Sequence, residues 1–392
     1  MRVLVLGGDG YLGWPTAMYL SARGHDVTVV DNYLKRELEV QVGAKPLVVP
    51  PRLLERVGIW QEMTGLFIRA VENDAKNFWG LAGLMEAAEP DAVVHFAEQP
   101  SGPYSMMGRE EAQFTLTNNL NTTMALIWAV LLRRPDCHII KLGTMGEYGT
   151  PGVLIPEGWM RLPGLPIGKK FLFPREAGSL YHTCKILETD LLHFYCRHQD
   201  LRVTDLMQGP VYGISTNETE LHSDLRTSFH YDDVFGTVLN RFITQAVVGV
   251  PLTVYGGGGQ IRGYLNLRDS LRCIELAMES PPDQGEMRIM NQFTEIFSVN
   301  QLAELVVQAW SDRTGQRAEI QHIKNPRRED EEHFYEAEHT ALEALGLEPT
   351  SLDGDVLDGM LAEVTKAGDQ VNTSWILPRV TWRDGWGRPE LS

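Results

Sequence analysis

Short hydrophobic runs alternate with longer amphipathic stretches along the first half of the chain. The runs at 3–6, 25–30, 92–96 and 138–142 have the length and apolar character of buried strands, and helical periodicity fills most of the intervals between them. Strands separated by helices pair in parallel, because each helical crossover returns the chain to the same end of the sheet. The pattern predicts an α/β fold with a doubly wound parallel sheet.

The second half of the chain is less regular. Residues 150–180 are rich in proline and glycine, which predicts an excursion over the carboxyl edge of the sheet, and helical periodicity returns at Tyr181. Beyond about residue 210 we expect a strand at 252–255, a glycine run at 256–259 and a helix at 299–310. This part predicts a smaller C-terminal lobe.

Composition narrows the classes of partner. The chain has 392 residues, of which 43% are hydrophobic, and its net charge is −17. An acidic protein repels nucleic acids and anionic membranes, so neither is expected as a partner. No apolar run reaches the roughly 18 residues of a membrane span, and a strand is expected directly after Met1, so we expect a cytoplasmic protein. The four cysteines show no metal-ligand spacing, and we expect neither a disulfide nor a metal.

A glycine-rich turn follows the first predicted strand. Gly7, Gly10 and Gly13 come directly after the run at 3–6, and Pro15 suits the first turn of a helix. Such a turn serves either tight packing or dinucleotide binding, and its place between a strand and a helix favours the dinucleotide. The sequence therefore predicts a Rossmann-type cofactor site.

Two carboxylates mark the expected adenosine end of that site. Asp31 ends the second predicted strand, about 20 residues further on, where a carboxylate accepts hydrogen bonds from the ribose. A carboxylate there repels a ribose phosphate, so NAD is predicted, with NADP as the alternative because Lys35 and Arg36 follow closely. Asp74 either contacts adenine or caps a helix.

A tyrosine and a lysine share one predicted helix face. Tyr181 and Lys185 are four residues apart, so a lysine ammonium can stabilise the tyrosinate. At about 4 Å and an effective dielectric near 20, that charge is worth about 4 kcal/mol, or roughly three pKa units. Thr144 follows a buried run and would place its hydroxyl beside a substrate hydroxyl. Thr144, Tyr181 and Lys185 predict proton abstraction from a sugar hydroxyl while NAD accepts the hydride.

These residues resemble the extended short-chain dehydrogenase/reductase superfamily. Longer runs resemble the UDP-sulfoquinovose synthase family within it, between residue 2 and about residue 382: GGDGYLGWPTA, KLGTMGEYGTP, YHTCK, FGTVLNRF, PLTVYGGGGQIRGYL and NQFTEIFSVNQLAELV. The resemblance implies oxidation of UDP-glucose at carbon 4 by tightly held NAD, loss of water across carbons 5 and 6, addition of sulfite at carbon 6, and return of the hydride. It also implies a homodimer, formed through the helices near 111–133 and 181–198.

The resemblance assigns residues 1–210 to an NAD-binding Rossmann domain. Residues 211–392 form mainly a nucleotide-sugar-binding lobe, with some segments returning to the first domain. The further cofactor contacts that we expect are Tyr11, Leu12, Asn32, Arg36 and Asn119. The expected substrate contacts are Thr144, Glu147, Gln208, Thr237, Leu239, Asn240, Leu252, Thr253, Gln260, Arg262 and Arg327, with the two arginines on the diphosphate. His182 serves either as the acid or base of the elimination or only as a hydrogen-bonding group.

Departures from the family pattern keep a second reaction open. Pro100 stands where the family has an arginine, which would be a natural holder of anionic sulfite, and Glu176 adds negative charge in place of a glutamine. These changes favour the alternative, a nucleotide-sugar 4-epimerase or dehydratase that does not use sulfite. An ordinary dehydratase is disfavoured, because such enzymes carry an Asp–Glu pair at the positions of Met145 and Gly146. A sensor or scaffold without turnover would not need Thr144, Tyr181 and Lys185 together.

Overall fold

The large sheet is built from the strands that the hydrophobic runs predict. The computed structural model describes residues 1–161, 163–164, 170–327 and 335–382. Within them, the main sheet has seven parallel strands, in the order β12 (Met287–Gln292), β8 (Arg202–Gln208), β5 (His138–Thr144), β4 (Ala92–His95), β1 (Arg2–Leu6), β2 (Asp26–Asp31) and β3 (Ile68–Glu72). This confirms the Rossmann-type parallel sheet. The chain changes direction across the sheet between β1 and β4, where such folds bind ligands.

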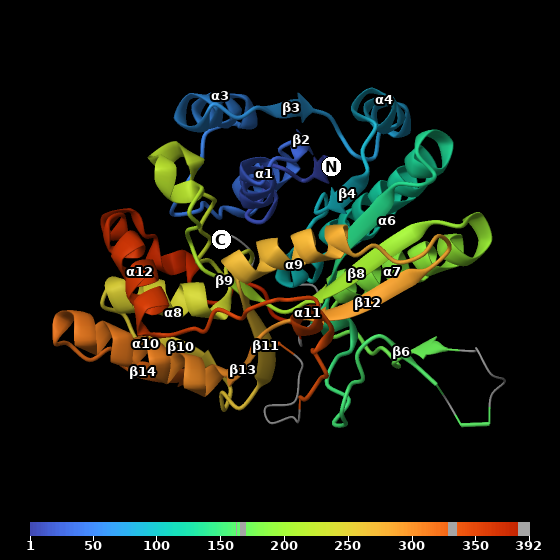
Figure 1. Ribbon diagram of the computed structural model, residues 1–392. Helices are drawn as coiled ribbons and strands as arrows, with labels where there is room; N and C mark the ends of the chain where they lie inside the picture. Colours follow the sequence, from blue (N-terminus) through green and yellow to red (C-terminus); the bar gives the residue numbers. More distant parts are fainter. Residues whose placement is uncertain (162, 165–169, 328–334, 383–392) are drawn as a thin grey trace.

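Helices cover both faces of the sheet, and side-chain alternation along β1 shows why (Figure 1). Val3 and Val5 belong to one core, whereas Leu4 and Leu6 belong to the other, because successive strand residues point to opposite faces. The helices are α1 (Gly13–Ala22), α2 (Leu34–Val42), α3 (Leu53–Thr64), α4 (Phe78–Ala88), α5 (Gly102–Ser105), α6 (Arg109–Arg133), α7 (Leu180–Gln199), α8 (Val238–Val247), α9 (Leu267–Glu279), α10 (Val299–Thr314), α11 (Ala341–Ala344) and α12 (Gly354–Thr365).

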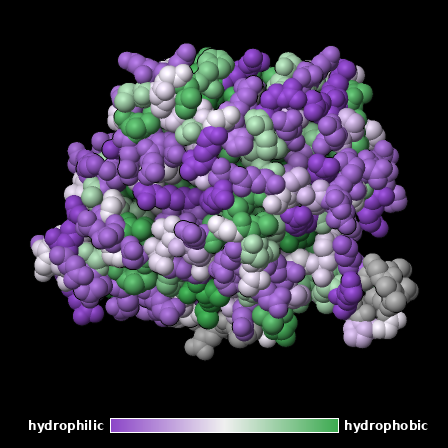
Figure 2. Space-filling model, viewed as in Figure 1, coloured by the Kyte–Doolittle hydropathy of each residue, from purple (hydrophilic) through white to green (hydrophobic). Residues whose placement is uncertain are grey.

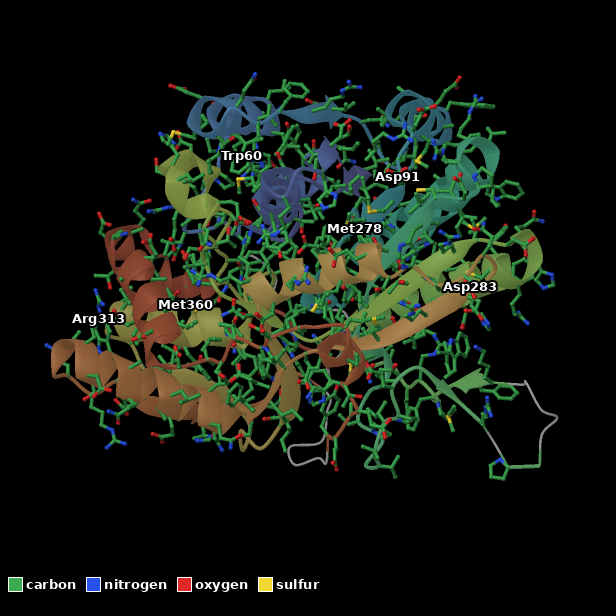
Figure 3. All side chains as sticks on the ribbon, viewed as in Figure 1. Trp60, Asp91, Met278, Asp283, Arg313 and Met360 are labelled. Atoms are coloured by element: carbon green, nitrogen blue, oxygen red, sulfur yellow. The ribbon has the colours of Figure 1, made fainter. Side chains whose placement is uncertain are left out.

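A smaller lobe has its own core. Its sheets pair β10 (Leu252–Tyr255) with β14 (Ile320–Ile323), and order β13 (Glu295–Ser298), β11 (Ile261–Asn266) and β9 (Val211–Tyr212) side by side. Figure 1 shows α8, α10 and α12 gathered beside them, away from the large sheet. Figure 3 labels Met360 of this core, and Trp60 and Met278 of the core that α3 and α9 share. The chain returns from the lobe to the large sheet through β12, the strand at the β8 edge.

The remaining elements are short. The hairpin β6 (Trp159–Met160) and β7 (Phe171–Leu172) lies in the proline-rich excursion, and single turns of 3₁₀ helix occur at Met145–Glu147, Thr219–Leu221, Ser223–Leu225, Gly368–Gln370 and Thr373–Trp375.

Figure 2 shows a face covered mostly by hydrophilic side chains, with hydrophobic ones scattered between them. No helix in the described part of the chain is long and apolar enough to cross a membrane.

The glycine turn explains how α1 comes so close to β1. A Cβ atom on Gly13 would lie 2.0 Å from the backbone oxygen of Gly7, whereas a Cβ on Gly10 would meet its nearest neighbour at 3.4 Å. Gly7 itself has a φ of +86°, which favours glycine. The start of the first helix is therefore packed against the turn with no room for a side chain at Gly13.

We expect Gly13→Ala to lower the free energy of unfolding by about 2 kcal/mol or more, because the added methyl group forces the helix away from the turn. Gly10→Ala is the matched control and should cost less than about 1 kcal/mol. Urea unfolding of the three proteins measures both effects. Equal stability of the two variants would contradict the close packing at Gly13.

Candidate active site

A large cavity lies at the carboxyl ends of the central strands. It has a volume of about 750 Å³ and is lined by the glycine turn, the ends of β2 and β5, the loop after β4, the start of α7 and residues of the lobe. Among the predicted residues, those that line it are Gly7, Gly10, Tyr11, Leu12, Gly13, Asp31, Asn32, Arg36, Asp74, Tyr181, Lys185, Gln208, Thr237 and Asn240. The fold therefore brings the predicted cofactor residues and the proton-transfer pair into one space.

Backbone groups and an aspartate shape the end of the cavity at β1 and β2. The amides of Gly7 and Gly8 donate to the Val30 carbonyl at 2.8 and 3.1 Å. The Asp31 carboxylate accepts from the amides of Asp9 at 2.9 Å and Tyr33 at 2.7 Å. Burial and the nearby Asp9 charge raise the pKa of Asp31 to about 6. The bare glycine backbone and the acceptor at Asp31 fit a dinucleotide with a free ribose.

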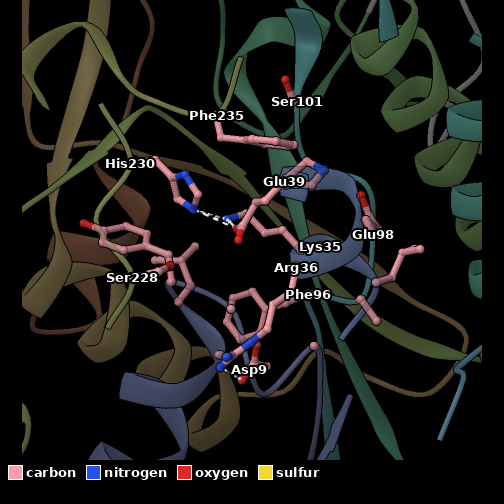
Figure 4. Close-up of a pocket in the computed structure, with 18 of the residues that line it drawn as sticks. Asp9, Lys35, Arg36, Glu39, Phe96, Glu98, Ser101, Ser228, His230 and Phe235 are labelled. Carbon is pink, nitrogen blue, oxygen red and sulfur yellow. Dashed lines mark hydrogen bonds and ion pairs between the residues drawn. The ribbon is translucent and has the colours of Figure 1, made fainter. Parts of the chain in front are cut away.

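Asp9 holds two arginines beside this end, and sequence reasoning missed it. Its carboxylate binds the Arg36 guanidinium through two contacts of 2.7 and 2.8 Å, and Arg56 Nη2 at 2.5 Å. Arg56 is fully buried on α3, and burial lowers its pKa to about 10. Figure 4 shows Arg36 reaching Asp9 at the cavity wall. The only signal in the sequence was an acidic residue inside the glycine turn.

The Lys35 ammonium also contacts a carboxylate and an imidazole. Its ammonium lies 2.8 Å from Glu39 and 2.5 Å from His230, and His230 lies 3.3 Å from Asp232. The dashed contacts in Figure 4 mark part of this group. Arg36 contacts Asp9, which it shares with Arg56, and Lys35 contacts Glu39, so both cations that kept NADP open already have a carboxylate partner, which favours NAD.

Asp74 lines the cavity and does not cap a helix. Its side chain accepts from the Lys76 amide at 2.9 Å, and the N-cap of α4 is Asn77, which accepts from the Gly80 amide at 3.1 Å. The capping alternative was therefore wrong, and the adenine contact stays a prediction.

Tyr181 and Lys185 lie in the first turns of α7. Ser179 caps this helix, and the Tyr181 amide donates to Ser105 Oγ at 3.1 Å. The Lys185 ammonium lies 5.8 Å from the centre of the Tyr181 ring and donates to the Leu142 carbonyl at 2.6 Å. Burial raises the pKa of Tyr181 to about 12, although the Lys185 charge acts to lower it. The phenol is thus protonated at neutral pH before ligands bind.

Lys185 is buried among carboxylates that the sequence reasoning did not assign to the site. Its ammonium forms an ion pair with Glu98, which follows β4, and lies 3.8 Å from Glu188 on α7. Burial lowers the pKa of Lys185, but Glu98, Tyr181 and Glu188 together raise it above its usual value. The sequence could have indicated Glu98, because this carboxylate comes just after the end of a buried parallel strand.

Thr144 and His182 flank the cavity rather than line it. Thr144 ends β5, pairs in register with Gln208, and accepts from the Gly146 amide at 3.1 Å. His182 Nδ1 lies 3.1 Å from Ser179 Oγ, and its ring packs so closely on Gly146 that a Cβ there would lie 2.5 Å from Nε2. Burial, Arg327 and Arg262 lower the pKa of His182 to about 3. His182 is therefore a neutral imidazole beside the predicted diphosphate arginines.

Arg262 and Arg327 come from different parts of the lobe. Arg262 lies on β11 and donates to the Ile261 carbonyl at 2.7 Å, and Arg327 lies 5.3 Å from the centre of the Trp382 ring. Both charges act on His182 on α7, so the fold brings the two arginines toward the same region. Their contact with a diphosphate stays a prediction.

Several residues predicted to contact cofactor or substrate do not line this cavity and have partners inside the protein. Glu147 is fully buried and lies 3.4 Å from Lys141 Nζ. Asn119 is fully buried and binds the backbone of Gln99, while its neighbour Asn118 lines the cavity. The others are buried residues of the lobe outside the cavity lining: Leu239, Leu252, Thr253 and Gln260. Their contact with cofactor or substrate stays a prediction.

Comparisons with known proteins agree with this geometry. The family model for the NAD dependent epimerase/dehydratase family matches residues 3–291. The chain is 44% identical over 389 residues to the chloroplastic UDP-sulfoquinovose synthase of Spinacia oleracea, covering 99% of this chain and 80% of that protein. It is 43% identical over 387 residues to the UDP-sulfoquinovose synthase of Sulfolobus acidocaldarius, covering 98% of each.

Solved structures share the fold at lower identity. The UDP-glucose 4-epimerase of Bifidobacterium longum, in complex with NAD⁺ and UDP, has a TM-score of 0.68 at 20% identity, covering 96% of this chain and 100% of that one. The UDP-glucose 4-epimerase of Thermotoga maritima, with UDP-glucose, has a TM-score of 0.67 at 20% identity, covering 93% of this chain and 99% of that one. The cofactor is NAD, as the family and the residues at the cavity both indicate. The chain belongs to the NAD dependent epimerase/dehydratase family, as a nucleotide-sugar enzyme similar to UDP-sulfoquinovose synthases over nearly its whole length.

Proposed function

We propose that the chain makes UDP-sulfoquinovose from UDP-glucose and sulfite, by oxidation at carbon 4, elimination of water across carbons 5 and 6, sulfite addition at carbon 6 and re-reduction. The observation that carries this proposal is the proton-transfer pair Tyr181 and Lys185 in the wall of the NAD cavity, beside a strand end that lacks the dehydratase Asp–Glu pair. The identity to two UDP-sulfoquinovose synthases over 98–99% of the chain supports the same conclusion.

The residues divide the first step between them. The glycine turn and Asp31 hold the cofactor, and bound NAD supplies a reversible hydride acceptor and a positive ring. The Tyr181 phenol first loses its own proton to solvent, because the Lys185 ammonium, 5.8 Å from its ring centre, and the positive ring that NAD would supply both stabilise the tyrosinate. The tyrosinate then takes the proton of the sugar 4-hydroxyl. The same proton returns from Tyr181 at re-reduction. Thr144, at the end of β5, orients the hydroxyl toward Tyr181.

His182 is the proposed base for the elimination. A neutral imidazole has a lone pair that accepts a proton, but burial, Arg327 and Arg262 lower the pKa of His182 and so weaken it as a base. A substrate diphosphate on the two arginines would offset their charge and favour the protonated imidazole. Glu147 is less suited to this step than its place in the sequence suggests, because it is fully buried beside Lys141 and Arg175. The elimination thus depends on a group from α7 rather than on the strand-end carboxylate.

Pro100 favours a second candidate, a 4-epimerase or dehydratase that does not use sulfite. It lines the cavity in the loop after β4, and a proline offers no charge or donor to an anion. The same Tyr181 and Lys185 would serve this reaction, because it also begins with oxidation at carbon 4.

We also propose a homodimer through α6 and α7. These two helices pack together and expose large apolar side chains: Trp128 (46%), Leu132 (50%), Leu187 (39%) and Phe194 (46%). A second copy would cover them. The cytoplasmic location expected from the sequence stays a prediction, because one of the relatives is chloroplastic.

Mass spectrometry of the purified protein with UDP-glucose separates the two reactions. We expect a sulfonated nucleotide sugar only when sulfite is present, because sulfite adds to the carbon 5,6 double bond. An isomerised or dehydrated product that forms equally with and without sulfite would instead support the second candidate function. Sulfite without UDP-glucose is the control.

Tyr181→Phe should retain bound NAD and lose at least about 100-fold in the rate of cofactor reduction by UDP-glucose, because the proton acceptor is gone. Tyr195→Phe is the matched control, since Tyr195 lies on the same helix and packs against Trp128. The absorbance of reduced cofactor after rapid mixing reports the rate. Similar rates in both variants would remove Tyr181 from the mechanism.

Pro100→Arg should lower the KM for sulfite by about tenfold, because a guanidinium adds a charge-assisted hydrogen bond to the anion. Pro100→Ala removes the proline without adding charge and should leave that KM unchanged. Steady-state rates at varied sulfite measure both. An unchanged KM in the arginine variant would show that sulfite binds elsewhere.

A further inference from the structure

Two carboxyl groups and one ammonium are buried together at the wall of the cavity, where Glu98 and Lys185 line it and Glu188 lies beside them. Glu98 reaches Lys185 from the loop after β4, and Glu188 reaches it from the next turn of α7, at 3.8 Å. The exposed fraction of the side chain is 3% for Glu98, 0% for Glu188 and 4% for Lys185. Figure 4 shows Glu98 among the residues that line the cavity. The group therefore touches the site but is nearly closed to bulk water.

The charges of this group balance only if it holds one proton. With both glutamates ionised, two buried carboxylates would repel each other and exceed the single charge of Lys185. With both protonated, the Lys185 ammonium would be buried without a counter-charge, which is strongly unfavourable. One proton and one negative charge across the two carboxyl groups satisfy Lys185 and avoid the repulsion.

The neighbouring groups do not supply a different balance. His95 lies 3.7 Å from Glu98, but burial lowers its pKa to about 4, so it is neutral. Lys141 faces Asp205 at 3.2 Å and Glu147 at 3.4 Å, so its charge is already matched. On α7, the Tyr181 phenol and the Cys184 thiol are neutral, because burial raises the pKa of each to about 12.

The two glutamates also differ in their preference for the proton. Burial raises the pKa of Glu98, but the Lys185 ammonium outweighs this effect and leaves that pKa below its usual value. Burial and the charge of Glu98 raise the pKa of Glu188 well above its usual value. The proton thus favours Glu188 and the negative charge favours Glu98, the closer partner of Lys185.

We propose that Glu98 and Glu188 are positioning residues that share one proton and so hold a single negative charge against the Lys185 ammonium. The pair keeps Lys185 protonated and pointed along α7 toward Tyr181. It does so without a second negative charge, which would oppose formation of the tyrosinate. Either carboxyl group can carry the charge when the other is neutralised. The catalytic consequence rests on the proposed roles of Tyr181 and Lys185, but the protonation state itself does not.

Infrared difference spectroscopy of the NAD-bound protein tests the shared proton without any substrate. At about pH 8, where ordinary carboxyl groups are ionised, we expect a protonated carboxyl band in the wild type that both Glu98→Gln and Glu188→Gln lose. Each substitution leaves one glutamate, which ionises because its repulsive neighbour is gone. The double variant should lose no more of the band than either single variant does.

Asp190→Asn is the matched control, because Asp190 lies on the same helix with 53% of its side chain exposed. It should leave the carboxyl band unchanged. A band that survives in Glu98→Gln and vanishes only in Glu188→Gln would show an isolated acid and overturn the sharing. No loss of the band in either variant would show that neither glutamate holds the proton, and would also overturn the proposal.

The pH dependence of cofactor reduction by UDP-glucose tests the catalytic consequence. Both single variants should keep the wild-type pH profile, because the pair retains its one charge. In the double variant Lys185 loses its counter-charge, so its pKa falls and the alkaline limb should move down by about one pH unit or more. Additive shifts in the single variants would contradict charge sharing. If UDP-glucose is not the substrate, no variant reduces the cofactor, whereas the infrared result still decides the proposal.

Discussion

The buried ammonium of Lys185 is the constraint on which the site depends. Removing such a charge from water costs several kcal/mol unless partners surround it. Three separate elements provide them: the Leu142 carbonyl at the end of β5, Glu98 after β4, and Glu188 on the same helix. These groups meet only when β4 and β5 stand in register and α7 packs behind them. The stability of the ion group and the geometry of catalysis therefore require the same arrangement.

Opposite charges are also buried together at the adenosine end of the cavity, but there the cations outnumber the carboxylate. There one carboxylate, Asp9, faces two arginines, and Arg56 is as fully buried as any core residue. Because Asp9 belongs to the glycine turn, the turn is tied electrostatically to α2 and α3 as well as packed against α1. The cations at this end of the cavity thus already contact a carboxylate of the glycine turn.

The sequence predicted the features that depend on local spacing. The strand at 252–255 coincides with β10, and the i to i+4 pair of Tyr181 and Lys185 lies on one helix at the cavity, as expected. Contacts between distant segments were not predictable from one sequence, because spacing says nothing about which side chains meet. Asp9 pairs with Arg56, 47 positions away. The Asn119 side chain fixes the backbone of Gln99, 20 positions away, a contact that the sequence did not predict.

That last contact explains why Pro100 matters. The loop around it is held on both sides: Gln99 binds Asn119 and Thr115, and Ser101 donates to the Val234 carbonyl at 2.5 Å. A side chain at position 100 therefore changes what the cavity presents to a ligand while the backbone stays in place. In our proposal, a charge at position 100 on this loop is what would favour a reaction that uses sulfite over one that does not. The fold, the cofactor site and the proton-transfer pair are common to both.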